Sequence, residues 1–149
     1  MFSIYGTSQE DTAYYDPVKN TLIHYEGRRV FLIYAESSDI PFDDYSVGLY
    51  GIEGKEGTFK DAEDGTLSKN PIEHGHVDST LSLSVTLHKQ ETKTVYYWIT
   101  VGETKSEVHE LHDYIKYRSP DQLIESTTKF WKAWLNRQEK LECDIPEKR

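Results

Sequence analysis

The stretch KTVYYWITVGETKSEVHELHDYI, residues 93–115, decides the fold class, because the spacing of its apolar residues changes part-way along. Residues 93–101 alternate between two faces, and this period of two predicts a β-strand. From Thr104 onward the apolar residues recur at helical spacing, and Thr104 and Glu107 match a capping box at a helix start. The alternating set is Val95, Tyr97, Ile99 and Val101 against Tyr96, Trp98 and Thr100. Because the second face is aromatic rather than polar, we expect another element to cover it.

The chain upstream of this helix is predicted to consist of strands and turns. Residues 21–25 and 28–35 are rich in β-branched and aromatic residues, and the turn at Gly27 between them favours a tight hairpin. Residues 45–52 form a further candidate strand. Residues 81–88 alternate apolar and polar side chains, so we expect them to pair with the strand described above in an antiparallel hairpin.

A second helix is predicted to begin with Ser119 as its N-cap and Pro120 in the first helical position, and to run to about Gln138. One wide face of this helix is apolar and aromatic. Its members are Leu123, Thr127, Phe130, Trp131, Trp134 and Leu135. So large an apolar face on a terminal helix predicts packing against a partner, with Trp131 and Trp134 as the main contact residues.

Strands followed by helices predict a mainly β fold, an antiparallel β-sandwich with helices at its C-terminal end. We assign residues 1–102 to the sandwich, residues 103–138 to two linker-like helices that pack on the sandwich or on a further domain, and residues 139–149 to a charged tail. A length of 149 residues suits one domain of this kind.

The composition argues against several classes of function. The formal net charge is −9, and no basic cluster larger than Arg28–Arg29 occurs. Binding to nucleic acid or to an anionic membrane is therefore not expected. The longest apolar run, residues 30–35, is too short to cross a bilayer, and residues 1–11 lack the pattern of a signal peptide. A single cysteine, Cys143, fits a reducing compartment, so we expect a cytoplasmic protein.

Three carboxylates crowd into the stretch DAEDGTLSKNP, residues 61–71. Asp61, Glu63 and Asp64 do not match an EF-hand loop, because Gly65 stands at the fifth position and no glutamate follows at the twelfth. A pair of carboxylates for glycoside hydrolysis remains open. The alternative is a turn at Gly65, with the acids in solvent or paired with basic side chains.

Two other motifs are candidate sites. His74, His76 and Asp78 have the H-x-H-x-D spacing of metallo-β-lactamases, whose side chains bind zinc, but the histidine that follows in that motif is absent. The other interpretation is a pair of surface histidines beside a glycine turn. Tyr96 and Trp98 could stack on a sugar, or they could pack across strands of the sheet. No nucleophile motif or phosphate loop occurs, and no cofactor is expected.

Four segments in this order resemble the N-terminal region of prokaryotic glucoamylase-type enzymes of glycoside hydrolase family 15, which includes glucoamylases, glucodextranases and some trehalases. The resemblance covers the chain from Thr12 to Leu135. The segments are TAYYDPVKNTLIHYEGRRVFLIYAES (12–37), DAEDGTLSKNPIEHGHVDSTLSL (61–83), TVYYWITVGETKSEVHELHDYI (94–115) and ESTTKFWKAWL (125–135).

The resemblance implies a large antiparallel supersandwich of the galactose-mutarotase-like kind, then a helical linker, then an (α/α)6 barrel that carries the two catalytic glutamates. No segment of this sequence matches that barrel, so no catalytic residue is assigned. The implied partner is the barrel of the same polypeptide, against which Trp131 and Trp134 would pack. The acidic loop would face the barrel or the rim of its active site, and its residues of interest are Asp61, Glu63, Asp64 and Asn70.

The sequence therefore favours a non-catalytic domain of a glucoamylase-type hydrolase acting on α-glucosides, which stabilises the barrel and shapes substrate access. Two alternatives stay open. One is a stand-alone carbohydrate-binding module that stacks α-glucan on Tyr96 and Trp98. The other is a metal-dependent hydrolase built on His74, His76 and Asp78. For the isolated chain, the apolar face of the second helix would either be exposed or be hidden in a homodimer.

Overall fold

The computed structural model describes residues 2–5, 10–51 and 54–136. Contacts between residues divide the chain into two units, and the boundary follows Asp113, inside the first helix. No helix in these described ranges is both long and apolar enough to cross a bilayer.

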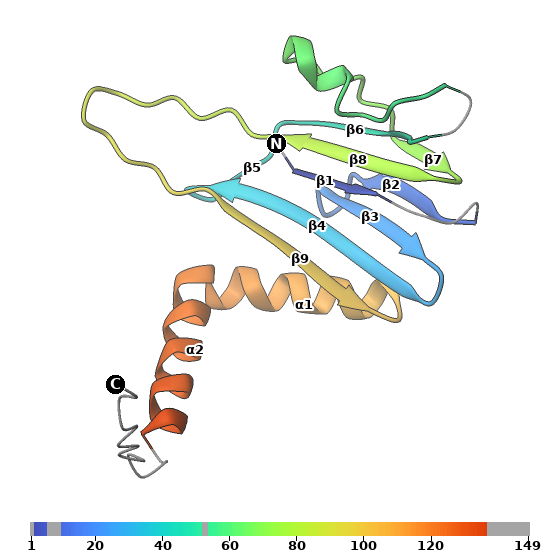
Figure 1. Cartoon of the computed structure of the whole chain (residues 1–149). Coiled ribbons are helices and arrows are strands. Elements are labelled where there is room, and N and C mark those ends of the chain that lie inside the picture. Colours follow the sequence, from blue (N-terminus) through green and yellow to red (C-terminus); the bar gives the residue numbers. More distant parts are fainter. Residues whose placement is uncertain (1, 6–9, 52–53, 137–149) are drawn as a thin grey trace, which may run out of the picture. The chain divides into compact units, whose positions relative to one another are not determined.

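The first unit is mainly β, with antiparallel strands in two sheets (Figure 1). One sheet has the order β1-β8-β6, and the other has the order β5-β4-β3-β2-β7 with β9 paired to β4. The strands are β1 (Phe2–Tyr5), β2 (Thr12–Asp16), β3 (Thr21–Glu26), β4 (Arg29–Ser37), β5 (Ile40–Pro41), β6 (Asp44–Leu49), β7 (Ile72–His74), β8 (Val77–Ser82) and β9 (Tyr96–Gly102). A short 3-10 helix, η1 (Asp61–Asp64), lies between β6 and β7, and helix α1 (Lys105–Arg118) follows β9.

The segment that leads into β7 joins the two sheets. The Val47 N–H donates to the carbonyl oxygen of Asn70 (3.1 Å), so this segment lies along β6. One residue later, the Tyr15 N–H donates to the carbonyl oxygen of Pro71 (2.8 Å), and β7 then pairs with β2. The backbone therefore passes from one sheet to the other within a few residues, and this holds the end of the preceding loop in place.

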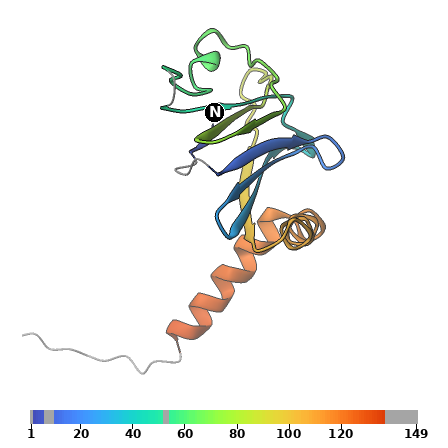
Figure 2. The same cartoon turned by 90° about the vertical axis from the view of Figure 1, so that its right-hand side faces the viewer.

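Figure 2 shows the strands of the first unit turned by 90° from the view of Figure 1. Side chains from the two sheets meet in a shared core. His24 on β3 places its Nε2 2.7 Å from the Oγ of Ser79 on β8. The rings of Tyr15 on β2 and Tyr45 on β6 stack with their centres 3.9 Å apart. The buried apolar residues are Ala13, Leu22, Ile23, Val30, Leu32, Ile33, Tyr34, Ala35, Phe42, Val47, Val77, Leu81 and Val108. Burial of this apolar surface is the main favourable contribution to the stability of the unit.

Helix α1 covers the aromatic face of β9, a face that the sequence predicted to be covered by another element without indicating which one. The Thr100 hydroxyl donates to the carbonyl oxygen of Val108 (2.9 Å), and the Trp98 indole N–H donates to Nδ1 of His112 (3.2 Å). Val108 and His112 are the two buried residues of this helix. The contacts explain why β9 has no polar face, since its second face packs against α1.

The predicted hairpin between residues 81–88 and 93–101 is wrong. Strand β8 ends at Ser82 and pairs with β1 and β6, while β9 pairs along its whole length with β4. The residues between them contain no strand and are mostly exposed. The physical reason is that β4 is buried on both faces and offers β9 a longer apolar partner than the polar alternation of residues 83–88 can.

Other local predictions are confirmed. Strands β3 and β4 form the predicted hairpin, and Gly27 in its turn has a φ of 58°, which glycine adopts at little cost. At the start of α1, the Glu107 N–H donates to the Thr104 hydroxyl (3.2 Å). At the start of α2 (Pro120–Leu135), the Gln122 N–H donates to the Ser119 hydroxyl (3.4 Å). The predicted end at Gln138 lies outside the described residues.

Helix α2 belongs to the second unit and buries none of its side chains. Trp131 is 52% exposed and Trp134 is 46% exposed. Their rings contact each other edge to face, with centres 5.7 Å apart, and Phe130 packs on Trp131 in the same way. Within the part of the chain that the structure describes, this aromatic face of α2 is therefore available to a partner.

Candidate functional site

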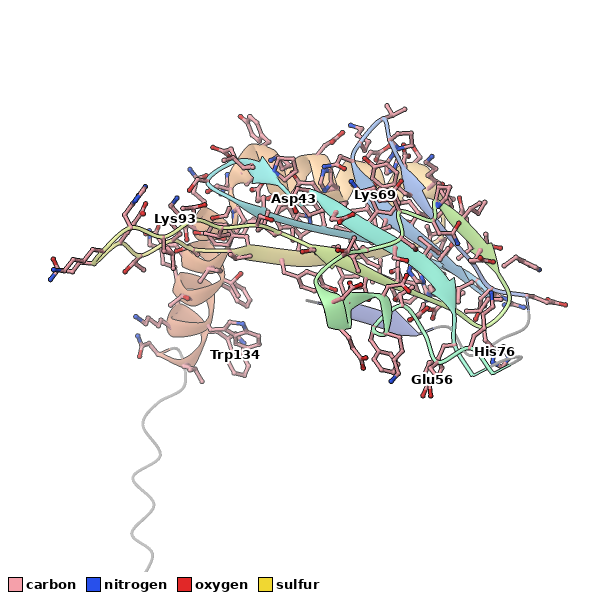
Figure 3. The ribbon with its side chains drawn as sticks, turned by 90° about the horizontal axis from the view of Figure 1, so that it is seen from above. Asp43, Glu56, Lys69, His76, Lys93 and Trp134 are labelled. Carbon is pink, nitrogen blue, oxygen red and sulfur yellow. The ribbon has the colours of Figure 1, made fainter. Side chains whose placement is uncertain are left out.

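A hollow of about 400 Å³ lies over β6, where the loop between Gly54 and Glu73 folds back across the strand. Glu56, labelled in Figure 3, belongs to this loop. The lining residues are Val47, Gly48, Leu49, Gly54, Lys55, Glu56, Gly57, Thr58, Lys60, Asp61, Ser68, Asn70 and Glu73. The volume falls in the range of small-molecule sites, about 300–1,000 Å³.

Thr58 anchors the loop to β8. Its N–H donates to Oδ2 of Asp78 (2.6 Å), and its hydroxyl donates to the same oxygen (2.8 Å). This close approach requires glycine at two positions. A Cβ on Gly48 would lie 2.7 Å from Cγ2 of Thr58, and one on Gly57 would lie 2.8 Å from Oδ2 of Asp78. The two glycines therefore allow the loop to seat directly on the strands beneath it.

Asp78 is a buried anchor beneath the hollow. Its side chain is 0% exposed and does not line the cavity. Burial raises the pKa of this carboxyl above its usual value, the hydrogen bonds from Thr58 oppose that rise, and the charge of Asp61 adds to it. Its Oδ1 has no hydrogen-bond partner among the residues described. Asp78 thus holds the loop and does not reach into the cavity.

Polar side chains make one wall of the hollow. The Ser46 hydroxyl donates to Oδ2 of Asp61 (3.0 Å) and lies 2.7 Å from the Ser68 hydroxyl. The Asn70 amide donates to a backbone carbonyl of β6 and to Oε1 of Glu73, each at 2.8 Å. These bonds fix the Asp61, Asn70 and Glu73 side chains in place. In each carboxylate the second oxygen makes no hydrogen bond within the described residues, so it is available to a ligand.

A second hollow of about 310 Å³ adjoins the first, and Lys55 and Glu56 line both. Its aromatic walls are Tyr50, which is 44% exposed, and Phe59, which is 37% exposed. Both rings approach Gly57, since a Cβ there would lie 3.1 Å from Tyr50 and 3.3 Å from Phe59. These two aromatics were not predicted as site residues from the sequence. The cluster of glycines around them was the available signal, because glycine permits close approach.

The acidic loop is divided between the cavity and solvent. Asp61 and Asn70 line the hollow. Glu63 instead lies 3.3 Å from the Lys60 ammonium, and Asp64 accepts a hydrogen bond from the N–H two residues ahead of it (2.9 Å). The left-handed residue that ends η1 is Gly65, with a φ of 83°. Glu63 and Asp64 therefore belong to the turn that ends η1, and the structure does not bring them to the wall of the hollow.

The histidine motif lies along the β7–β8 connection. Nδ1 of His74 is 2.8 Å from the hydroxyl of Thr12, and Asp78 is bound to Thr58 as described. His76 follows the glycine turn and is partly buried. No group of three or more His, Cys, Asp or Glu side chains within residues 2–5, 10–51 and 54–136 is arranged to hold a metal ion.

The proposed stacking residues of β9 face other parts of the protein. The Trp98 ring lies against Tyr34, with ring centres 4.7 Å apart, and its indole N–H is bonded to His112. Tyr96, at the start of β9, is partly buried. Trp98 is therefore a packing residue between β9 and α1, and the exposed aromatic rings beside the cavity are those of Tyr50 and Phe59.

The chain was compared with known proteins in three ways. No protein-family model, no curated protein and no solved structure matches it. The site is therefore interpreted from its own geometry.

Proposed function

We propose that this chain is a non-catalytic β-sandwich domain of a glucoamylase-type glycoside hydrolase of family 15. In this proposal it stabilises an (α/α)6 catalytic barrel and shapes the access of α-glucosides to it. The observation that carries the proposal is the exposed aromatic face of α2. The proposal includes a cytoplasmic location, which the single cysteine supports.

The α2 face has the chemistry of a protein contact. Trp131, Trp134 and Phe130 are 46–61% exposed, and apolar aromatic clusters of this kind are typical of the buried centres of interfaces. Burying the exposed halves of two tryptophans removes on the order of 200–250 Å² of apolar surface, or about 5 kcal/mol before the entropic cost of association. Helices pack on one another by fitting side-chain ridges into grooves, so a helical partner can match this face.

The carboxylates of the first unit support a non-catalytic role. Glycoside hydrolysis by the common mechanism needs an acid and a base or nucleophile facing each other across the bond. Here Asp61 and Glu73 each accept a hydrogen bond from a neighbouring side chain in the cavity wall, and Asp78 is sealed beneath the loop. Each carboxylate thus has a structural role in the described part of the chain.

Two measurements test the proposal. The isolated chain should release no glucose from maltose, starch or trehalose, whereas the separately produced helical barrel of a family 15 glucoamylase should bind it. Binding should raise the unfolding temperature of the barrel, because a ligand of the folded state stabilises that state. Glucose release by the chain alone at an enzyme-like rate, or no binding to the barrel, would overturn the proposal.

Replacing both tryptophans should separate association from folding. In the Trp131→Ala, Trp134→Ala variant we expect the β unit to keep its unfolding midpoint, because neither ring is buried. Barrel binding, and any homodimer formed by the isolated chain, should be lost. Sedimentation and thermal unfolding measure the two properties, and Val18→Ala, at another exposed apolar residue (87%), is the control. Global unfolding of the double variant would mean that the rings are part of the core.

A further inference from the structure

We propose that the two adjoining hollows form a groove that binds an α-linked gluco-oligosaccharide. Tyr50 and Phe59 provide the stacking rings, and Asp61, Asn70 and Glu73 provide the hydrogen-bonding groups. The choice of an α-glucan rests on the proposed function, whereas the existence of the groove and its preference for a neutral sugar rest on its own geometry. We call this site the loop groove.

The loop groove combines two kinds of surface that a sugar requires. A pyranose ring has an apolar face of C–H groups, which packs on an aromatic ring, and an edge of hydroxyls, which need polar partners. Tyr50 and Phe59 remain 44% and 37% exposed on either side of Gly57. The Lys60 ammonium lies over the Phe59 ring, 5.6 Å from its centre, so a sugar would stack on the part of the ring that the ammonium leaves uncovered.

The polar wall suits hydroxyl groups. A carboxylate oxygen or an amide carbonyl oxygen accepts hydrogen bonds from sugar hydroxyls. Asp61 and Glu73 each use one oxygen within the protein and keep the other available. Asn70 uses its amide nitrogen for two internal bonds, which leaves its side-chain oxygen as the atom that can accept a hydrogen bond from a ligand. The wall can therefore accept several hydrogen bonds without rearranging.

The charge of the loop groove argues for a neutral ligand. The lining residues carry charges of both signs, two positive on Lys55 and Lys60 and three negative on Glu56, Asp61 and Glu73. A phosphate would be repelled by the carboxylates, and a cation would be repelled by the lysines. No metal-binding cluster is found in the described ranges of the chain. A neutral polyhydroxylated molecule avoids both penalties, because it brings no charge that must be desolvated.

The loop groove is also held in shape before a ligand arrives. Thr58 is bonded twice to buried Asp78, the Gly51 N–H donates to the carbonyl oxygen of Lys55 (2.8 Å), and the far end of the loop is bonded to β6. Binding would therefore order few groups, which reduces its entropic cost. Both hollows are open, so a bound oligosaccharide would stay partly exposed to solvent. We therefore expect a dissociation constant on the order of 0.1–1 mM for the oligosaccharide.

Nuclear magnetic resonance titration of the full chain tests this proposal. Maltotriose and maltoheptaose should shift the amide signals of Gly54, Gly57, Thr58 and Asn70, whereas cellotriose, which is β-linked, should shift them much less. Tyr50→Ala and Phe59→Ala should each weaken maltoheptaose binding by about two- to tenfold. Asp61→Asn should weaken it without changing the unfolding midpoint. Tyr25→Ala is the matched control, because Tyr25 is as exposed as Phe59 (37%) and lies outside the groove.

The outcomes separate this inference from the proposed function. No shift with either maltooligosaccharide, or equal shifts with cellotriose, would overturn the loop groove as an α-glucan site. An equal loss of binding in Tyr25→Ala would also overturn it, since the effect would then not depend on the groove. Barrel binding through α2 without sugar binding would support the proposed function and contradict the loop groove as a sugar site. Sugar binding without barrel binding would support the loop groove and contradict the proposed function.

Discussion

Acidification from pH 6.5 to pH 4 will remove about 3 kcal/mol from the free energy of unfolding through His24 alone. His24 is 0% exposed between the two sheets, where Nε2 meets the Ser79 hydroxyl. Burial lowers the pKa of His24 from 6.5 to about 4, and the charge of Asp11 raises it by less. Nδ1 lies 4.0 Å from Glu26, too far for a hydrogen bond, so the ring is neutral in the folded protein.

The direction of this effect follows from where the proton binds. Between pH 6.5 and pH 4 the unfolded chain binds a proton on His24 and the folded protein does not. Protonation therefore stabilises the unfolded state, and stability falls as the pH falls. Well above pH 6.5, from about pH 7.5, both states are neutral at this residue, and the contribution of His24 no longer depends on pH.

Denaturant unfolding of the wild type and of His24→Gln measures the effect. A glutamine amide can replace Nε2 beside Ser79 but does not titrate. The variant should therefore lose about 3 kcal/mol less than the wild type on going from neutral pH to about pH 4. The ring signals of His24 should titrate near pH 4 in the same interval. Equal pH dependence in the two proteins would show that the pKa of His24 is the same in the folded and unfolded states, which would contradict the prediction.

The second large effect is expected from Gly57→Ala, which should lower the free energy of unfolding by about 2–4 kcal/mol. Gly57 has a φ of 104°, a backbone conformation that L-residues rarely adopt. The new Cβ would also lie 2.8 Å from Oδ2 of buried Asp78. Because that oxygen accepts both bonds from Thr58, relief of the clash must displace the anchor of the loop.

Gly65→Ala is the matched control for this prediction. Gly65 also has a positive φ, of 83°, but no atom lies within 4 Å of its added Cβ. The Gly65→Ala substitution should therefore lower the free energy of unfolding by only about 1 kcal/mol, the cost of placing alanine at a positive φ. The larger loss of stability in Gly57→Ala than in Gly65→Ala measures the effect of the contact with Asp78. Gly57→Ala should also lose sugar binding in the loop groove. Equal losses at the two glycines, measured by denaturant unfolding, would contradict the close approach.

The elements that sequence analysis predicted correctly are those whose signals lie within a few residues. The β3–β4 hairpin is marked by the turn at Gly27, and both helices are marked by their caps at Thr104 and Ser119. Each of these signals acts through hydrogen bonds between neighbours in the chain. The need for a cover over the aromatic face of β9 was also predicted, although α1 as the cover was not.

The strand partners were harder to predict. The alternation in residues 81–88 is real, but it extends beyond the end of β8 and says nothing about which strand it pairs with. Pairing depends on which buried surface is available in three dimensions, and β4 provides that surface to β9. For the same reason the site was only half predicted. Asp61 and Asn70 were selected from the acidic loop, whereas Tyr50 and Phe59 were not selected at all.

The local amino-acid sequence thus specifies where helices begin, where hairpins turn and which faces must be buried, because these features depend on contacts between residues that are near neighbours in the chain. The pairing of β9 with β4, the neutral state of His24 and the close approach of Gly57 to Asp78 come from residues far apart in the chain. Their energies arise from burial and from distances between separate elements. Those quantities exist only once the sheets have packed.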